Sequence, residues 1–286
     1  MKYADILPNA VRLKSKLQKL APHLQTAIKG QDHVIERVAS VLIRGELGLS
    51  SPGRPRGSFL FVGPTGVGKT EITLSFSDYL FGPGLVHRFD MSEFQNQSSV
   101  GLLLGATSAE CGLLGKATRE DKHGVLLFDE MEKAHPLVLD LFLQILDAGR
   151  ITLANGETKD LSGYYIVLTS NVGAAEAMRM ENSGFAAIER TVLKRLDQAL
   201  RPELVARITE KIVFARLTFE VQRQICETMI EKERARLAAL GHSLIITPEL
   251  VEELIREGFH RTLGARPMRS VVERRLQDMA VKSILK

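Results

Sequence analysis

A run of eight residues, GPTGVGKT, constrains this 286-residue chain more than any other stretch. It matches the pattern G-x-x-x-x-G-K-[ST], whose glycines let backbone N–H groups turn inward around phosphate oxygens. Apolar residues 59–62 precede it and apolar residues at helical spacing follow it, so we expect a strand, the loop and a helix in that order. A glycine-rich turn that binds no ligand is the alternative. The eight residues are Gly63, Pro64, Thr65, Gly66, Val67, Gly68, Lys69 and Thr70.

The last two residues of this loop carry its chemistry. Lys69 would reach the β- and γ-phosphates of a nucleotide, and Thr70 would hold Mg²⁺ through its hydroxyl group. The helix that follows would aim the positive end of its dipole at the same phosphate oxygens. The loop therefore predicts a nucleotide site that depends on Mg²⁺.

Two further apolar runs end in polar residues that fit such a site. Residues 125–128 end in Asp129 and Glu130. Asp129 would lie at the carboxyl end of its strand and support Mg²⁺, and Glu130 is placed to polarise the attacking water. Asn171 ends another apolar run, and its amide could orient that water, touch the γ-phosphate or simply cap the next helix.

The order of the predicted elements indicates an α/β protein of two domains. Strands at 59–62, 85–90, 125–128 and 165–169 alternate with helical segments such as 32–47, which favours a parallel sheet covered on both faces. From residue 218 the pattern becomes helical, with one short strand expected at 244–246 and a helix beginning at Thr247-Pro248. We expect a helix over 1–25, a nucleotide-binding domain over 26–215 and a small domain over 216–286.

The first of these segments is amphipathic. Residues 9–25 carry leucines at helical spacing, with basic residues on the polar side, and we expect one helix between Pro8 and Pro22. It could dock on its own domain or a neighbouring one, on a partner, or on a membrane surface. The leucines are Leu13, Leu17, Leu20 and Leu24.

Composition excludes several other classes of protein. The apolar fraction of 44% and the charged fraction of 25% are those of a soluble globular protein. No apolar run reaches the length of a membrane span, and the N-terminus lacks the apolar region of a signal peptide. Cys111 and Cys226 form no metal-binding pattern and fit a reduced, cytoplasmic setting. The net charge of +4 comes without a basic stripe interleaved with aromatic residues, so nucleic acid is not an expected partner.

Several longer strings resemble the Clp/Hsp100 family of AAA+ ATPases, in particular the second ATPase domain of the ClpA, ClpB and ClpC type. The resemblance runs from Leu17 to Leu285 and implies a three-layer αβα domain of the AAA+ P-loop NTPase fold, followed by a small helical lid domain. It also implies ATP hydrolysis with Mg²⁺, here by a stand-alone module. The strings are IKGQD at 28–32, the strand and phosphate loop at 57–71, DMSE at 90–93, DEMEKAHP at 129–136, TSNVG at 169–173, RPEL at 201–204 and GARP at 264–267.

The resemblance assigns further roles. It implies that Asn171 is the polar sensor of the γ-phosphate and that Arg266 is the sensor-2 arginine of the lid. Arg207 matches the arginine finger that acts on a neighbour's nucleotide, which implies a homo-oligomeric ring of six, although a surface salt bridge would look the same and Ala206 replaces the family's preceding Asn. Ile28 falls in the segment that contacts adenine, where a buried isoleucine is equally expected.

The chain departs from the family where the family grips its substrate. Glu110 stands in place of the pore tyrosine, and a carboxylate prefers water to apolar contact. Residues 183–185, Ser-Gly-Phe, replace the apolar tripeptide that docks a peptidase, so we expect no peptidase docking. The favoured hypothesis is an ATP-driven motor that remodels a specific protein partner or adaptor without general threading. A nucleotide-gated assembly factor with little turnover and a DNA-associated ATPase are the alternatives.

Overall fold

The computed structural model describes residues 3–180, 183–260 and 262–284, and it divides into two compact units. The first unit comprises residues 1–63 and 68–214, and the second comprises 64–67 and 215–286. The second unit thus takes in the middle of the phosphate loop, Pro64–Val67.

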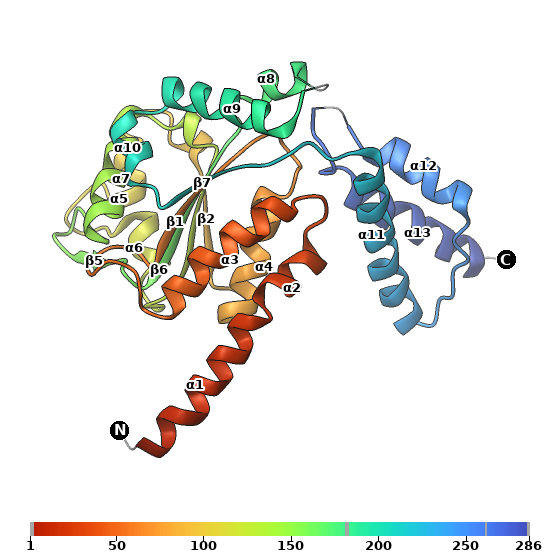
Figure 1. Cartoon of the computed structure of the whole chain (residues 1–286), viewed down its shortest axis with the longest axis horizontal. Helices are drawn as coiled ribbons and strands as arrows, with labels where there is room; N and C mark the ends of the chain where they lie inside the picture. The colour runs from red at the N-terminus through yellow and green to blue at the C-terminus, as the bar shows by residue number, and fades with distance from the viewer. Residues whose placement is uncertain (1–2, 181–182, 261, 285–286) are drawn as a thin grey trace. The chain divides into compact units, whose positions relative to one another are not determined.

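The first unit is an α/β structure built on a five-stranded sheet (Figure 1). The strand order is β2-β3-β6-β1-β7, and each neighbouring pair is parallel, which confirms the predicted parallel sheet. A separate antiparallel pair is formed by β4 and β5. The strands are β1 (Gly57–Val62), β2 (Val86–Asp90), β3 (Gly124–Asp129), β4 (Arg150–Thr152), β5 (Thr158–Asp160), β6 (Tyr164–Ser170) and β7 (Glu210–Val213).

Helices cover both faces of this sheet (Figure 1). On one face, Leu126 and Phe128 of β3 belong to a large apolar cluster that includes residues of α5 to α10. On the other face, the ring of Phe76 in α4 lies 6.1 Å from that of Phe59 in β1. The helices are α1 (Tyr3–Gln18), α2 (Leu20–Ala27), α3 (Asp32–Glu46), α4 (Lys69–Phe81), α5 (Ser99–Leu104), α6 (Gly112–Ala117), α7 (Pro136–Ala148), α8 (Ala174–Arg179), α9 (Phe185–Ala199) and α10 (Pro202–Arg207), with 3-10 turns η1 (Met91–Glu93) and η2 (Met131–Lys133).

The three central strands explain why the polar residues of the motifs converge. All residues of β1, β3 and β6 are buried, because both faces of the sheet are covered. Parallel pairing brings the carboxyl ends of these strands to one edge, where Val62 pairs with Ser170. This edge carries the phosphate loop after β1, Glu130 after β3 and Asn171 after β6.

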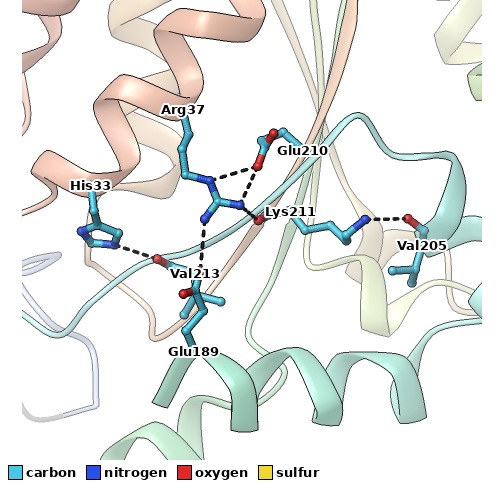
Figure 2. A network of polar contacts seen from close by, with 7 residues as sticks. All are labelled: His33, Arg37, Glu189, Val205, Glu210, Lys211 and Val213. Carbon is cyan, nitrogen blue, oxygen red and sulfur yellow. Dashed lines mark hydrogen bonds and ion pairs between the residues drawn. The ribbon is translucent and has the colours of Figure 1, made fainter. Parts of the chain in front are cut away.

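A polar network holds the edge strand β7, which the sequence analysis did not predict, against α3 and α9 (Figure 2). The guanidinium of Arg37 donates to Glu210 Oε1 and, at 3.1 Å, to Glu189 Oε1. It also donates to the carbonyl of Lys211 at 2.6 Å. His33 Nε2 lies 3.0 Å from the carbonyl oxygen of Val213, the last residue of β7. The network thus ties α3 to the strand that leads into the second unit.

The N-terminal segment differs from the single helix predicted between two prolines. The structure has two helices with a break at Lys19, and Pro8 and Pro22 lie inside them. Pro22 is tolerated because it is the third residue of α2, where an intrahelical N–H bond is not required. Leu20 and Leu24 are fully buried, and the His23 ring stacks on Tyr79 of α4 at 4.4 Å. The end of α1 and the whole of α2 therefore pack on their own unit.

The second unit is helical, with α11 (Phe219–Ala239), α12 (Pro248–Gly258) and α13 (Met268–Ile284) around a shared apolar cluster. Thr247 caps α12 as predicted, with Leu250 N–H donating to its hydroxyl at 3.3 Å. The predicted strand at 244–246 was wrong. Ile245 is 83% exposed, and no strand of this unit's described residues lies beside it to pair with. In the part of the chain that the structure describes, no helix has the length and apolar character of a membrane span.

Candidate active site at the carboxyl edge of the sheet

The first and last glycines of the phosphate loop have backbone conformations that suit glycine. Gly63 has φ of 146°, and a Cβ there would lie 2.9 Å from the carbonyl oxygen of Phe214. Gly68, with φ of 108°, is the N-cap residue of α4 and offers no side chain to the first N–H groups of that helix. A helix start of this kind attracts an anion, because its N–H groups and its dipole both favour negative charge.

Lys69 connects the loop to two of the other predicted site residues. It is buried, and its ammonium donates to the carbonyl of Gly63 at 2.5 Å and to Asn171 Oδ1 at 2.9 Å. The other end of the same amide, Asn171 Nδ2, donates to Glu130 Oε1 at 3.2 Å. The structure therefore joins Lys69, Asn171 and Glu130 in one hydrogen-bonded chain, although they lie 41 to 102 positions apart in the sequence.

Glu130 has a strained backbone. Its φ and ψ angles of 59° and 52° lie in the left-handed region, and it is the one non-glycine residue with positive φ among those described. Such a conformation costs an L-residue roughly 1–2 kcal/mol. Strain of this sort persists where the surroundings hold it, and it collects at functional sites. Here the backbone N–H of Glu130 donates to Thr169 Oγ1 at 3.1 Å.

Asp129 is almost completely buried beside Glu130. Its Oδ1 accepts a hydrogen bond from Thr169 Oγ1 at 2.6 Å. Its Oδ2 is buried and receives no aligned hydrogen bond among the described residues, but Arg88 Nη2 lies 2.6 Å away as an ion pair. One carboxylate oxygen is thus fixed to the neighbouring strand, while the other faces a cation.

These residues fit ATP and Mg²⁺. The glycine conformations and the uncapped start of α4 suit phosphate oxygens, and the buried ammonium of Lys69 adds a positive charge. Asp129 Oδ2, which lacks a hydrogen bond, is a carboxylate oxygen of the type that Mg²⁺ prefers. Thr70, the second residue of α4, would be the other metal-supporting group.

The remaining predicted residues lie in different places. Ile28 is buried, and a Cβ on Gly68 would lie 3.9 Å from its Cγ2, so it stands beside the end of the phosphate loop. Arg207 ends α10, where its Nε donates to Asp147 and its Nη1 donates to the carbonyl of Glu203 at 2.6 Å. Arg266 belongs to the second unit and lies two residues before the first residue of α13.

The two segments that depart from the family pattern also have local partners. Glu110 is exposed, and its Oε2 accepts the N–H of Ala106 at 3.1 Å, which closes the turn of its own loop. Phe185 packs against the large apolar cluster, with its ring 4.3 Å from that of His33. Its aromatic surface therefore contributes to its own unit.

Comparison with known proteins identifies the family to which this site belongs. A family model described as "AAA domain (Cdc48 subfamily)" matches residues 54–211, more than half of the chain, and includes the phosphate loop, Asp129, Glu130 and Asn171. The chain belongs to the AAA+ ATPases. A second model, "C-terminal, D2-small domain, of ClpB protein", matches residues 217–286. The resemblance to the second ATPase domain of Clp/Hsp100 proteins is thereby confirmed.

Individual AAA+ relatives agree with this assignment. The chaperone protein ClpB of Aquifex aeolicus is 38% identical over 95% of this chain and 28% of its own length. Heat shock protein 100 of Trypanosoma brucei brucei is 39% identical over 92% of this chain and 31% of its own. Among solved structures, the Hsp104–ADP complex of S. cerevisiae covers 95% of this chain and 48% of its own, with a TM-score of 0.85 and 30% identity. The chain thus spans about a third of the length of these two curated relatives.

Three residues of the site were not singled out from the sequence. Thr169 and Glu132 stood inside recognised strings, but their contacts join residues far apart in the sequence; Asn171 N–H, for example, donates to Glu132 Oε1 at 3.0 Å. Arg88 could have been singled out, because a charged residue within a predicted strand needs an oppositely charged partner, and Asp129 ends another strand of the same predicted sheet. The contact of Thr169 with Asp129 needed the pairing of β3 with β6, which the sequence analysis did not specify.

Proposed function

We propose that this protein binds Mg·ATP at the carboxyl edge of its five-stranded sheet and hydrolyses it. The observation that carries this proposal is the hydrogen-bonded chain of Lys69, Asn171 and Glu130 beside the buried Asp129. Solved Hsp104 structures of the same fold were obtained with ADP and with ATPγS, which supports a nucleotide at the corresponding edge.

The chemistry would rest on positioning and charge neutralisation. Mg·ATP, when bound, would supply the bond to be broken, and Asp129 and Thr70 would hold its divalent cation. The ammonium of Lys69 would turn from Gly63 and Asn171 to the phosphates. Glu130, carried on its strained backbone, would polarise the attacking water, and Asn171 would orient that water or contact the γ-phosphate.

A ring, which we propose to be hexameric, would complete each site. Arg207 would act on the nucleotide of a neighbouring copy, and Arg266 would serve as the sensor arginine of the lid domain, residues 216–286. The contact of Arg207 with Asp147 does not oppose this role. Both side chains are about a third or more exposed, and exposed ion pairs contribute only about 0–1 kcal/mol. The finger can therefore leave Asp147 at little cost.

ATP hydrolysis would drive the remodelling of a specific protein partner in the cytoplasm, with no role for nucleic acid or a peptidase. Glu110 supports this restriction, because its carboxylate is exposed and engaged in its own loop. The loop therefore offers no aromatic surface to grip varied side chains. General threading of unfolded polypeptide is accordingly not part of the proposed activity.

Two substitutions in the site test the ATPase proposal. Glu130→Gln should retain ATP binding and lose hydrolysis by at least about 100-fold, since general-base groups contribute about 10²–10⁴-fold. Lys69→Ala should lose ATP binding itself. Arg195→Gln, which breaks an ion pair between α9 and Glu176 of α8, is the control and should leave both unchanged. Hydrolysis by Glu130→Gln at the wild-type rate would contradict the assignment. The same variant, loaded with ATP, can be used to capture the protein partner.

A further inference from the structure

Arg88 and Asp129 face each other across two neighbouring strands. In the parallel register of β2 and β3, Arg88 pairs with Leu127 and Asp90 pairs with Asp129. Successive side chains of a strand point to opposite faces, so Arg88 and Asp129 lie on the same face, one diagonal step apart. Arg88 Nη2 reaches Asp129 Oδ2 at 2.6 Å.

The two oxygens of the Asp129 carboxylate have different surroundings. Oδ1 accepts the hydroxyl of Thr169, which is itself buried in β6. Oδ2 has the guanidinium of Arg88 beside it, without hydrogen-bond alignment. The Asp129 side chain is only 7% exposed, whereas that of Arg88 is 49% exposed. The arginine can therefore swing into water, while the carboxylate stays where it is.

A buried carboxylate requires a counter-ion whether or not nucleotide is bound. Leaving one unpaired is strongly unfavourable, because the lost hydration is not replaced. A divalent cation delivered with the phosphates would be a stronger counter-ion for the same oxygen than one guanidinium. A divalent cation at Oδ2 would repel the guanidinium beside it, and this would favour release of the half-exposed Arg88 into water.

We propose that Arg88 is the exchangeable counter-ion of Asp129, which it pairs with until Mg²⁺ enters with the nucleotide and displaces it. Arg88 is in this sense a positioning residue that sets how strongly nucleotide binding depends on Mg²⁺. The inference rests on the proposed ATP site and adds a residue to it. It assigns to Arg88 no contact with the phosphates.

The proposal predicts opposite effects of Arg88→Gln in two buffers. Without Mg²⁺, ADP should bind the variant more weakly, since an uncompensated carboxylate then faces the phosphates. With Mg²⁺, ADP should bind at least as tightly as to the wild type, since no arginine has to be displaced. The dissociation constant without Mg²⁺ divided by that with Mg²⁺ should therefore be about tenfold larger in Arg88→Gln than in the wild type, which corresponds to about 1.4 kcal/mol.

The experiment measures binding of a fluorescent ADP to the full chain, in EDTA and in excess Mg²⁺. Arg88→Lys keeps a cation at this position and should stay within about threefold of the wild-type ratio. Arg195→Gln removes an arginine of similar exposure whose partner, Glu176, is not one of the site residues, and it should not change the ratio. As a second readout, the extra rise in melting temperature that Mg²⁺ adds to that from ADP should be larger in Arg88→Gln.

Three results would overturn the proposal. The first is Arg88→Gln with both dissociation constants, and so their ratio, as in the wild type. The second is equal weakening in both buffers, which would mean that Arg88 binds the phosphates directly. The third, decisive if Arg88→Gln does not fold, is a tenfold rise in the ratio for Arg88→Lys. Failure of the wild type to bind ADP in either buffer would instead refute the nucleotide site itself.

Discussion

Thr169→Val should destabilise the first unit more than any comparable change of a buried threonine, because one hydroxyl serves two groups. Thr169 Oγ1 donates to Asp129 Oδ1 at 2.6 Å and accepts the N–H of Glu130 at 3.1 Å. Valine keeps the shape and removes both bonds. A hydrogen bond to a charged group contributes about 1.5–3 kcal/mol, and a buried donor left without a partner costs about 1–3 kcal/mol.

We expect a total loss of about 3 kcal/mol, towards the lower end of that sum because Glu130 is only partly buried. For a unit of this size that corresponds to a fall in melting temperature of about 6–12 °C. The assay is thermal unfolding by circular dichroism in EDTA without nucleotide. Hydrogen exchange of β3 and β6 peptides assigns the loss to this unit.

Thr73→Val is the matched control. Thr73 is also fully buried, but its hydroxyl donates only to the carbonyl of Lys69 at 3.1 Å, one turn earlier in α4. That carbonyl keeps the backbone bond of the helix, so the control should change stability by less than about 1 kcal/mol. If Thr169→Val costs no more than Thr73→Val, the double role of the Thr169 hydroxyl is refuted.

Three further predictions concern other parts of the chain. Arg207→Ala should abolish ATP hydrolysis while its ADP affinity stays within about twofold of the wild type. The reason is that, among the interactions described, only Asp147 and Glu203 contact this side chain. Full turnover by the variant alone would rule out the ring model. Glu110→Tyr should gain ATP-driven threading of an unfolded model substrate that the wild type lacks, and robust threading by the wild type would refute the assigned role. Hydrogen bonding from Arg236 holds the pKa of Glu233 below its usual range. The ionised Glu233 therefore stabilises the second unit above about pH 4.3, and this stabilisation is lost as pH falls through the lowered pKa of the folded state. Glu233→Gln should make the stability of this unit depend less on pH in that acid range, and an unchanged dependence would contradict the assignment.

The elements that the sequence predicted well are those whose pattern is local. The strands around the site are continuous apolar runs because both faces of the sheet are covered, and such runs are visible without knowing the neighbours. The cap of α12 is equally local, since Thr247 and Pro248 act within one turn. Because parallel strands end at the same edge of a sheet, the sequence alone predicted that Lys69, Glu130 and Asn171 lie at one edge, without knowledge of the strand register.

The errors arose where tertiary contacts decide. Residues 244–246 carry a β-like sequence, but a strand needs a partner, and Ile245 is left in solvent. The prolines near the N-terminus suggested one short helix, whereas Leu20 and Leu24 bury themselves against their own unit in a second helix. Helix propensity and the positions of prolines predict helix boundaries poorly where packing against α4 supplies most of the stabilisation of the helix.

The contacts of Thr169 also bear on why Glu130 stands on a strained backbone. The hydroxyl has one proton, which it gives to Asp129, and this fixes the direction in which its lone pair can accept the N–H of Glu130. The left-handed conformation of Glu130 keeps that N–H directed at Thr169 while its side chain reaches Asn171. The carboxylate expected to support the metal and the carboxylate expected to act on water therefore share one anchoring atom. Because Thr169 holds the Asp129 carboxylate in place when Arg88 leaves it, exchange of the counter-ion should leave the orientation of Glu130 unchanged.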